Sequence, residues 1–295
     1  MKHNAPSRKV LICLSLIAGM LAANALWAAP TRSATGDLDR SFGGYGSSGR
    51  VIGDPFPGTS IANTVTTPDE KLIAVGSNGQ DIVVARYDAD GKLDLSFGTN
   101  GVTTLDFNNQ TDFASSVAIT YDAKKILVAG TTNFGTRASP NGDFAVARLN
   151  ADGKPDTTFS QDGKTTVDFN GRYDGATSVI DFIENKILVV GSVEQNPPGI
   201  PCAPSCNKDF GLARLNGDGS PDPSFGSSGK VQNDFGGDDT PTTVVFSSNT
   251  IYAAGYRMTG TTSEYVVSLY NYGNGKLNTN FNGTGYRTGA TPSIV

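Results

Sequence analysis

The side chains best suited to chemistry in this 295-residue chain are acidic and basic residues that recur at fixed spacings. Asp88, Asp90 and Asp94 surround a glycine in a pattern that resembles part of a calcium loop. The pattern recurs twice with carboxylates, at Asn150, Asp152 and Asp156 and at Asn216, Asp218 and Asp222. A calcium loop is longer, with a third early ligand and a terminal bidentate acid. A fourth copy carries only Asn271, Asn274 and Asn278, so the pattern favours a tight turn and we expect no metal there.

Two further charged positions recur with the same period. They are Arg86, Arg148 and Arg214, and the aspartates Asp106, Asp168 and Asp234 of an Asp-Phe or Asp-Phe-like pair. A catalytic site is normally built once, whereas these residues return in repeat after repeat. The repetition therefore favours ion pairs or backbone contacts between repeats over catalysis.

The N-terminus has the three parts of an export signal, in order. Lys2, Arg8 and Lys9 form a basic region, an apolar run follows, and Ala23-Asn24-Ala25 fits the small-x-small cleavage rule. We expect cleavage after Ala25 or Ala28, so that residues 1–28 are a signal peptide and residues 29–295 form the mature domain. This pattern predicts a secreted or periplasmic bacterial protein that uses the general export route and has no membrane span after cleavage.

Removal of that signal takes away the only histidine, His3, and the only tryptophan, Trp27. Without imidazole, Ser-His-Asp and Cys-His catalysis, histidine acid–base chemistry and histidine-ligated zinc are all excluded. The chain is acidic, with a net charge of −5 before cleavage, which argues against a nucleic-acid partner. We expect a protein that is not an enzyme and uses no cofactor. A carbohydrate-active enzyme with paired carboxylates is the alternative.

Two cysteines remain in the mature chain, and they lie four positions apart. In an exported protein with no other soft ligand nearby, Cys202 and Cys206 are expected to form a disulfide.

The elements that hold these residues form an internal repeat. The stretch DFAVARLNADGKPDTTFSQDGKTTVDFN, from Asp143, returns in similar form from Asp81, Asp209 and, more loosely, Glu264. Each repeat contains four short apolar segments, here called A to D, which in one copy read SSVAITYDA, KKILVAGTT, DFAVARLN and KTTVDFN. Their length, β-branched content and flanking turn residues predict strands. A period of about 55–65 residues indicates a repeat architecture.

Segment C is apolar on both faces. Phe144 and Val146 point to one side, and Ala145, Ala147 and Leu149 point to the other. A strand of this kind lies between two packed sheets. Four-stranded units that are each covered by their neighbours predict an all-β fold, a β-propeller of four-stranded antiparallel blades. A transmembrane barrel would need longer strands and aromatic girdles.

The long motif DFxxARLNxDGxxDxxFGxxGxVxxDF, with KILVAG before it, resembles the bacterial delta-60 repeat of exported proteins. The resemblance implies a β-propeller-like fold and implies no catalytic residues. It covers about residues 36–285. The fourth copy departs most from the motif, because Leu269 replaces the arginine and Asn274-Gly275 replaces Asp-Gly.

The segments give four repeats, at about residues 50–107, 112–169, 174–235 and 239–288. A lone D-like strand at residues 50–54 is expected to pair with the fourth blade and close the ring. A piece of a larger ring is the alternative.

The connections between segments B and C vary most in length and composition. Binding residues concentrate on loops that a rigid scaffold holds. We therefore expect a binding or interaction module that contacts an unknown protein or glycan at the cell envelope, with a purely structural envelope protein as a further alternative. The candidate contact residues are Phe134, Arg137, Glu194, Tyr256 and Arg257.

Overall fold

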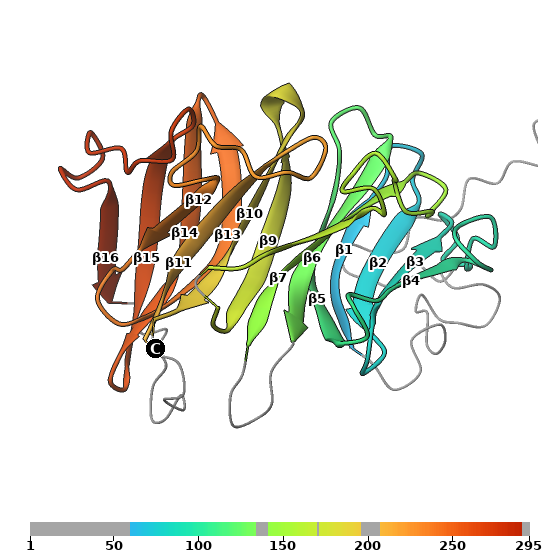
Figure 1. The fold of residues 1–295 in the computed structure, drawn as a ribbon, viewed down its shortest axis with the longest axis horizontal. Helices are drawn as coiled ribbons and strands as arrows, with labels where there is room; N and C mark the ends of the chain where they lie inside the picture. The colour runs from blue at the N-terminus through green and yellow to red at the C-terminus, as the bar shows by residue number, and fades with distance from the viewer. Residues whose placement is uncertain (1–59, 134–140, 170, 196–206, 291–295) are drawn as a thin grey trace, which may run out of the picture. The chain divides into compact units, whose positions relative to one another are not determined.

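The computed structural model describes residues 60–133, 141–169, 171–195 and 207–290. These residues form four antiparallel sheets of four strands each, with strands paired in chain order (Figure 1). The predicted all-β fold of four four-stranded blades is confirmed. Within the described residues, no helix is long and apolar enough to cross a membrane.

Each sheet contains one A, B, C and D segment in that order. The first sheet holds β1 (Ile61–Thr66), β2 (Leu72–Ser77), β3 (Ile82–Tyr87) and β4 (Val102–Leu105). The second holds β5 (Thr111–Ile119), β6 (Lys125–Asn133), β7 (Gly142–Asn150) and β8 (Lys164–Val167). The third holds β9 (Asp174–Phe182), β10 (Lys186–Glu194), β11 (Lys208–Asn216) and β12 (Lys230–Asn233), with the short 3-10 turn η1 (Ile183–Asn185) after β9. The fourth holds β13 (Asp238–Ser247), β14 (Thr250–Thr259), β15 (Thr262–Asn271) and β16 (Tyr286–Ala290). The closing strand predicted at residues 50–54 lies outside the described residues.

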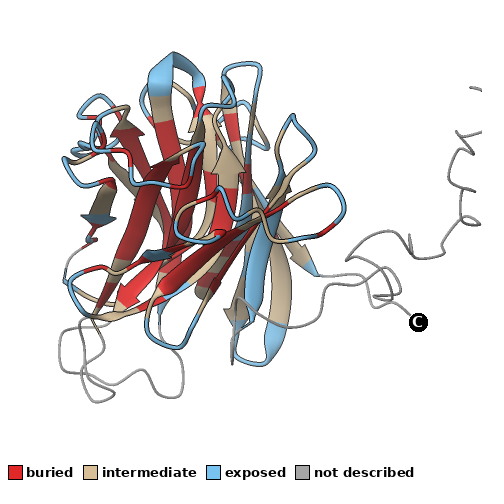
Figure 2. Ribbon diagram, turned by 90° about the vertical axis from the view of Figure 1, so that its right-hand side faces the viewer, coloured by how far each residue is buried: buried red, intermediate tan, exposed pale blue. Residues whose placement is uncertain are grey.

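Successive sheets pack face to face and bury three apolar cores between them. Ala145, Ala147 and Leu149 of β7 lie in the core shared with the first sheet. Phe144 and Val146, on the other face of β7, lie in the core shared with the third sheet. Segment C is therefore apolar on both faces because each face packs against a neighbouring sheet, as the sequence predicted. The strands in the middle of the sheets are the most buried (Figure 2).

Every B strand contains a glycine because the A strand bulges toward it at that level. In the second sheet the register shifts between Ala114 and Ser116, opposite Gly130. A Cβ built on Gly130 would lie 1.9 Å from the carbonyl oxygen of Phe113, and one on Gly255 would lie 2.0 Å from that of Thr240. No side chain fits there, so glycine is required by close backbone approach.

The antiparallel strands place the connections on two opposite rims. The B–C rim carries the connections from B to C and from D to the next A, among them residues 106–110, 168–173 and 234–237. The A–B rim carries the turns from A to B, at residues 67–71, 120–124, 183–185 and 248–249, and the turns from C to D. The two rims hold different candidate sites.

Candidate functional site

The recurring arginines lie at the A–B rim and join one sheet to the next. The Nε of Arg148 donates to Oδ2 of Asp156 at 2.7 Å, and Arg214 does the same to Asp222 at 2.8 Å. A lysine at the start of the B strand completes each pair, at 2.9 Å for Lys125 and 3.1 Å for Lys186. The Nη1 groups reach across to a carbonyl of the following sheet in all three copies: Arg86 to Ala151, Arg148 to Gly217 and Arg214 to Tyr272. The expected backbone contact between repeats is confirmed for the arginines.

A phenylalanine completes this inter-sheet contact, which we call the clasp. Phe97, Phe159 and Phe225 have no exposed surface, and each arginine lies over its ring at 4.5–5.0 Å. The residue after each ring donates its N–H to the Asp-Gly turn, or the Asn-Gly turn, of the next sheet. That turn needs glycine for two reasons. Gly219 has φ +86°, and a Cβ on it would lie 3.1 Å from the ring of Phe159.

The turn carboxylates are therefore occupied by partners within the chain. Asp88 accepts a hydrogen bond from the N–H of Lys92 at 2.8 Å, as a turn residue does. Asp94, Asp156 and Asp222 all hold an arginine and a lysine. This arrangement agrees with the interpretation of the motif as a turn.

The clasp depends on an ionised carboxylate, so acid should weaken it. Burial would by itself raise the pKa of Asp222, but hydrogen bonds from Ser224 and the cations of Lys186 and Arg214 lower the pKa to about 2. Because the folded pKa lies below the unfolded value of about 4, the stabilisation is full above pH 4 and is lost as the pH falls toward 2. The shift corresponds to about 2 kcal/mol.

We therefore expect the melting temperature of the wild-type protein to fall more steeply between about pH 4 and 2 than that of Asp222→Asn. The variant lacks the ionised carboxylate, so it has no such stabilisation to lose. Thermal melts at a series of pH values measure the difference. Asp90→Asn, which changes an exposed turn carboxylate, should follow the wild-type profile. Parallel profiles for wild type and Asp222→Asn would contradict the prediction.

Among the described residues the D-segment aspartates form no ion pair, so of the two expected kinds of contact only the backbone contact is found. Asp106, Asp168 and Asp234 lie at the B–C rim, each within 4.8 Å of two other carboxylates through one oxygen atom of each. The three groups are Asp81, Asp106 and Asp112; Asp143, Asp168 and Asp174; and Asp209, Asp234 and Asp239. Only the backbone carbonyls of Asp106 and Asp168 make the expected contact between repeats, with Lys164 and Lys230. The sequence missed the third member of each group, at the start of the next A strand.

The candidate B–C loop residues have different surroundings from one another. Glu194 is 6% exposed and engaged with a partner, and Arg257 pairs with Glu264 at 2.6 Å. Tyr256 is exposed. Phe134, Arg137, Cys202 and Cys206 lie outside the described residues. Of the three described candidates, only Tyr256 combines exposure with a large contact surface.

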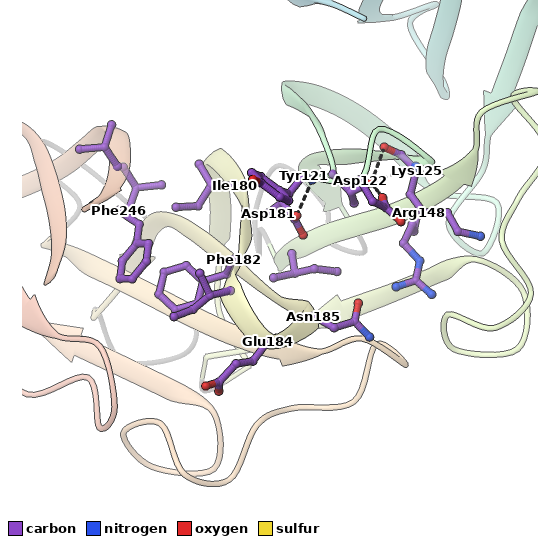
Figure 3. Close-up of a pocket in the computed structure, with 15 residues that line it drawn as sticks. Tyr121, Asp122, Lys125, Arg148, Ile180, Asp181, Phe182, Glu184, Asn185 and Phe246 are labelled. Carbon is purple, nitrogen blue, oxygen red and sulfur yellow. Dashed lines mark hydrogen bonds between the residues drawn. The ribbon is translucent and has the colours of Figure 1, made fainter. Parts of the chain in front are cut away.

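A pocket of about 1000 Å³ lies on the opposite rim, among the A–B turns of the second and third sheets and the end of β13 (Figure 3). Its wall includes three exposed apolar side chains, Tyr121, Ile183 and Val245. The ring of Tyr121 is fully exposed, while its backbone N–H donates to Asp181 of the neighbouring sheet at 2.7 Å. Apolar residues in otherwise polar turns are the sequence signal that could have indicated this pocket.

Acidic and amide groups lie beside these apolar side chains. Asp122, Glu184 and Asn185 line the pocket, and Glu184 accepts a hydrogen bond from the hydroxyl of Tyr272 at 2.7 Å. That bond raises the pKa of Tyr272. Burial raises the pKa of Asp181, and the nearby Asp122 raises it further, against hydrogen bonds from two backbone N–H groups. Lys125 and Arg148 also line the pocket, and both pair with Asp156. The pocket thus combines apolar side chains with several hydrogen-bond acceptors.

Comparison with known proteins finds a β-propeller family whose model matches parts of three repeats. Residues 67–97, 124–159 and 207–225 match a family described as "Domain of unknown function (DUF5122) beta-propeller". Each matched segment ends on a clasp phenylalanine, Phe97, Phe159 or Phe225. No curated protein matches the chain.

Several solved structures share parts of the architecture at low similarity. A GH43_12 protein from a capybara gut metagenome is 14% identical with a TM-score of 0.42, over 82% of this chain and 42% of that one. Drosophila Semaphorin 1b is 12% identical with a TM-score of 0.38, over 72% and 40%. Drosophila Semaphorin 2a is 8% identical with a TM-score of 0.34, over 72% and 48%. The chain spans less than half the length of each of these structures.

Proposed function

We propose that the chain is an exported, non-catalytic β-propeller module that binds a glycan in the pocket at the A–B rim. The observation that carries this proposal is the fully exposed ring of Tyr121 at the edge of a pocket that also holds Asp122, Glu184 and Asn185. Specific pockets combine an apolar surface with a few polar groups that fix orientation. A sugar ring offers a matching pair of surfaces, C–H groups for an aromatic face and hydroxyls for carboxylate and amide oxygens.

The charge of the pocket supports a neutral, hydroxyl-rich ligand. The two cations in the wall share Asp156, and the acidic residues Asp122, Asp181 and Glu184 also line the pocket, so the pocket as a whole does not favour an anionic ligand. The remaining carboxylates are acceptors that suit hydroxyl donors. The N-terminal signal pattern and the resemblance to exported delta-60 repeats support a location outside the cytoplasm, where an envelope glycan is available.

A test of the proposal measures retention of the purified chain on an array of envelope oligosaccharides. Tyr121→Ala should weaken binding by about tenfold, because an aromatic contact contributes about 0.5–1.5 kcal/mol beyond its buried area. Its fold should be unaffected, since the removed ring is fully exposed. Leu95→Ala, which removes another exposed apolar side chain outside the pocket, is the matched control and should bind like the wild type.

The same glycan array tests which of the two rims binds the ligand. If Tyr256→Ala lowers retention and Tyr121→Ala does not, the binding surface is the B–C rim and the pocket assignment is wrong. No retention on any glycan, with capture of an envelope protein instead, would overturn the proposed ligand class and keep the binding module.

A carbohydrate-active enzyme is the second candidate, and the carboxyl groups of the pocket favour it. A carboxyl with a raised pKa beside an ionised one is the pairing that glycoside hydrolysis uses, and Asp181 and Asp122 have that relation. Release of reducing sugar from a bound glycan, abolished by Asp181→Asn while binding persists, would establish the enzyme. Retention without turnover supports the binder.

A further inference from the structure

The three aspartate groups at the B–C rim, which we call the aspartate triads, lie at the junctions between successive sheets. Each takes one residue from the start of a C segment, one from the end of the D segment of the same sheet, and one from the start of the next A strand (Asp112, Asp174 or Asp239). The same three positions meet three times, although the connecting sequences differ. The third members come from the neighbouring sheet, so each triad bridges two sheets.

The third member of every triad is a buried carboxylate with one unsatisfied oxygen. Asp112, Asp174 and Asp239 have no exposed surface. One oxygen of each accepts a backbone N–H from a phenylalanine, at 2.7, 2.6 and 2.6 Å. The other oxygen, Oδ1, makes no hydrogen bond of normal geometry among the described residues, although the Thr132 hydroxyl and the Glu194 N–H lie close enough to lower the pKa of Asp112 and Asp174. A buried, unpaired carboxylate oxygen is costly, so each of these atoms requires a partner.

No basic side chain among the described residues supplies that partner. Lys164 and Lys230 approach the first two triads, but they donate to the backbone carbonyls of Asp106 and Asp168. Arg172, in the loop of the second triad, forms no ion pair in the described part of the chain. Arg257, near the third, donates to Glu264 and to the carbonyl of Phe235. In the first two triads the carboxylates thus face one another without a neutralising cation from the described residues, and in the third Arg257 offsets part of the negative charge.

We propose that the aspartate triads are calcium sites, with one Ca²⁺ bound between each pair of successive sheets. Two oxygens that share a Ca²⁺ at about 2.3–2.6 Å lie no farther apart than about twice that distance. The oxygen atoms of each triad, all within 4.8 Å of one another, satisfy this limit. The donors are hard carboxylate oxygens without histidine or thiolate, a set that selects Ca²⁺, Mg²⁺ or Mn²⁺ over zinc and copper.

Calcium fits this group better than magnesium does. Magnesium requires near-octahedral geometry and keeps several of its waters, whereas Ca²⁺ accepts irregular sets of six to eight oxygens. Each triad combines a buried carboxylate with one at the end of a D segment that is half-buried (Asp106) or exposed (Asp168 and Asp234), which gives an irregular, partly open set. Water fills the remaining positions at such a site.

The electrostatics of the triads agree with a bound cation. Burial and neighbouring carboxylates raise the pKa of Asp174 to about 8, and the pKa of Asp143 rises to about 6 for the same reasons. The repulsion that raises these values is relieved by a proton or by a divalent ion. An ion relieves all three carboxylates at once, whereas one proton relieves a single carboxylate.

The three triads should differ in calcium affinity, and the pairing of strands gives the reason. Asp239 lies opposite Arg257 across the β13–β14 pair, and Arg257 lowers the pKa of Asp239, which burial raises to about 7. In the first triad the equivalent cross-strand residue is Thr132, whose hydroxyl lowers the pKa of Asp112. In the second triad it is Val193, whose side chain offers neither a charge nor a hydrogen bond. The second triad, Asp143, Asp168 and Asp174, should therefore bind calcium most tightly.

The experiment is a set of thermal melts and calcium titrations on the purified chain. With Ca²⁺ at 100 times the dissociation constant, one site raises the melting temperature by about 5–10 °C relative to chelator. Isothermal titration with CaCl₂ should show more than one site on the wild type. Asp174→Asn should lose the tightest one, and the triple variant Asp112→Asn/Asp174→Asn/Asp239→Asn should lose the calcium-dependent shift altogether.

The order of stability of the wild type and the triple variant should reverse between chelator and calcium. This reversal distinguishes a metal site from a carboxylate with a purely structural role. In chelator the triple variant should melt at or above the wild type, because the repulsion is gone, and in calcium it should melt below. Asp152→Asn, an exposed turn aspartate, is the matched control and should keep the full shift. The proposal is overturned if calcium does not shift the wild type, if the triple variant retains the shift, or if magnesium produces an equal one.

Discussion

Arg148→Met should lower the free energy of unfolding by about 3 kcal/mol. The guanidinium is buried and donates to Asp156, to Thr158 and to the carbonyl of Gly217 in the next sheet. Removing one member of a buried ion pair costs about 3–5 kcal/mol, because the other charge stays buried. Lys125 still holds Asp156 at 2.9 Å, so the lower end of that range applies. Equilibrium denaturation in urea measures the loss.

A double variant and a surface variant make this test specific. Arg148→Met/Asp156→Asn should recover part of the loss, since removal of both partners leaves no buried charge. Arg287→Met, at an exposed position on β16, should change the free energy of unfolding by less than about 0.5 kcal/mol. An equal loss for Arg148→Met and Arg287→Met would show that the clasp does not stabilise the junction.

Phe159→Ala should be equally or more damaging, at about 3–5 kcal/mol. The ring has no exposed surface, lies under Arg148 and fills the space beside Gly219 of the third sheet. Its deletion leaves a cavity between two sheets that are held apart by their other contacts. Chemical denaturation again gives the measurement.

The chain contains its own control for this variant. Phe281 occupies the same motif position in the fourth sheet, but it is only half-buried. Phe281→Ala should therefore cost much less than Phe159→Ala. Equal losses at the two positions would mean that the motif stabilises its own turn and not the junction between sheets.

The repeated architecture could be predicted from the sequence because it depends on local pattern. The alternation in segment C alone assigned Phe144 and Val146 to one core and Ala145 and Leu149 to another, and both assignments are confirmed. Strand C must be covered on both faces because it carries no polar side, so a stack of sheets is the solution that buries it.

The charged positions were harder to predict, because recurrence alone does not identify partners. Arg148 and Asp168 recur together, yet the antiparallel register pairs Phe144 with Val167 and so carries Asp168 past it, toward Asp143. Arg148 lies near the other end of the strand and finds Asp156 in the following turn. Strand direction separates the arginines from the D-segment aspartates.

The candidate sites depend on spacing between sheets, which no single repeat contains. Tyr121 and Ile183 belong to turns that are more than sixty positions apart in the sequence and meet only because the second and third sheets stack. Glu194 likewise is buried at the end of β10, where it pairs with Lys208 of β11, and does not lie in the variable loop. The sequence pattern predicts the strands, whereas the pocket and the triads form only when the sheets stack on one another.

All three clasps run in the same direction along the chain. Each clasp arginine donates to a backbone carbonyl of the next sheet in the chain, from Arg86 to Ala151, from Arg148 to Gly217 and from Arg214 to Tyr272. The fourth sheet accepts this contact, but Leu269 stands where its own arginine would be and has nothing to donate. A repeat unit duplicated in the middle of the array would meet a ready donor before it and a ready acceptor after it. A unit appended after the fourth sheet would meet no clasp arginine, so its junction would lack the contact that stabilises the other three.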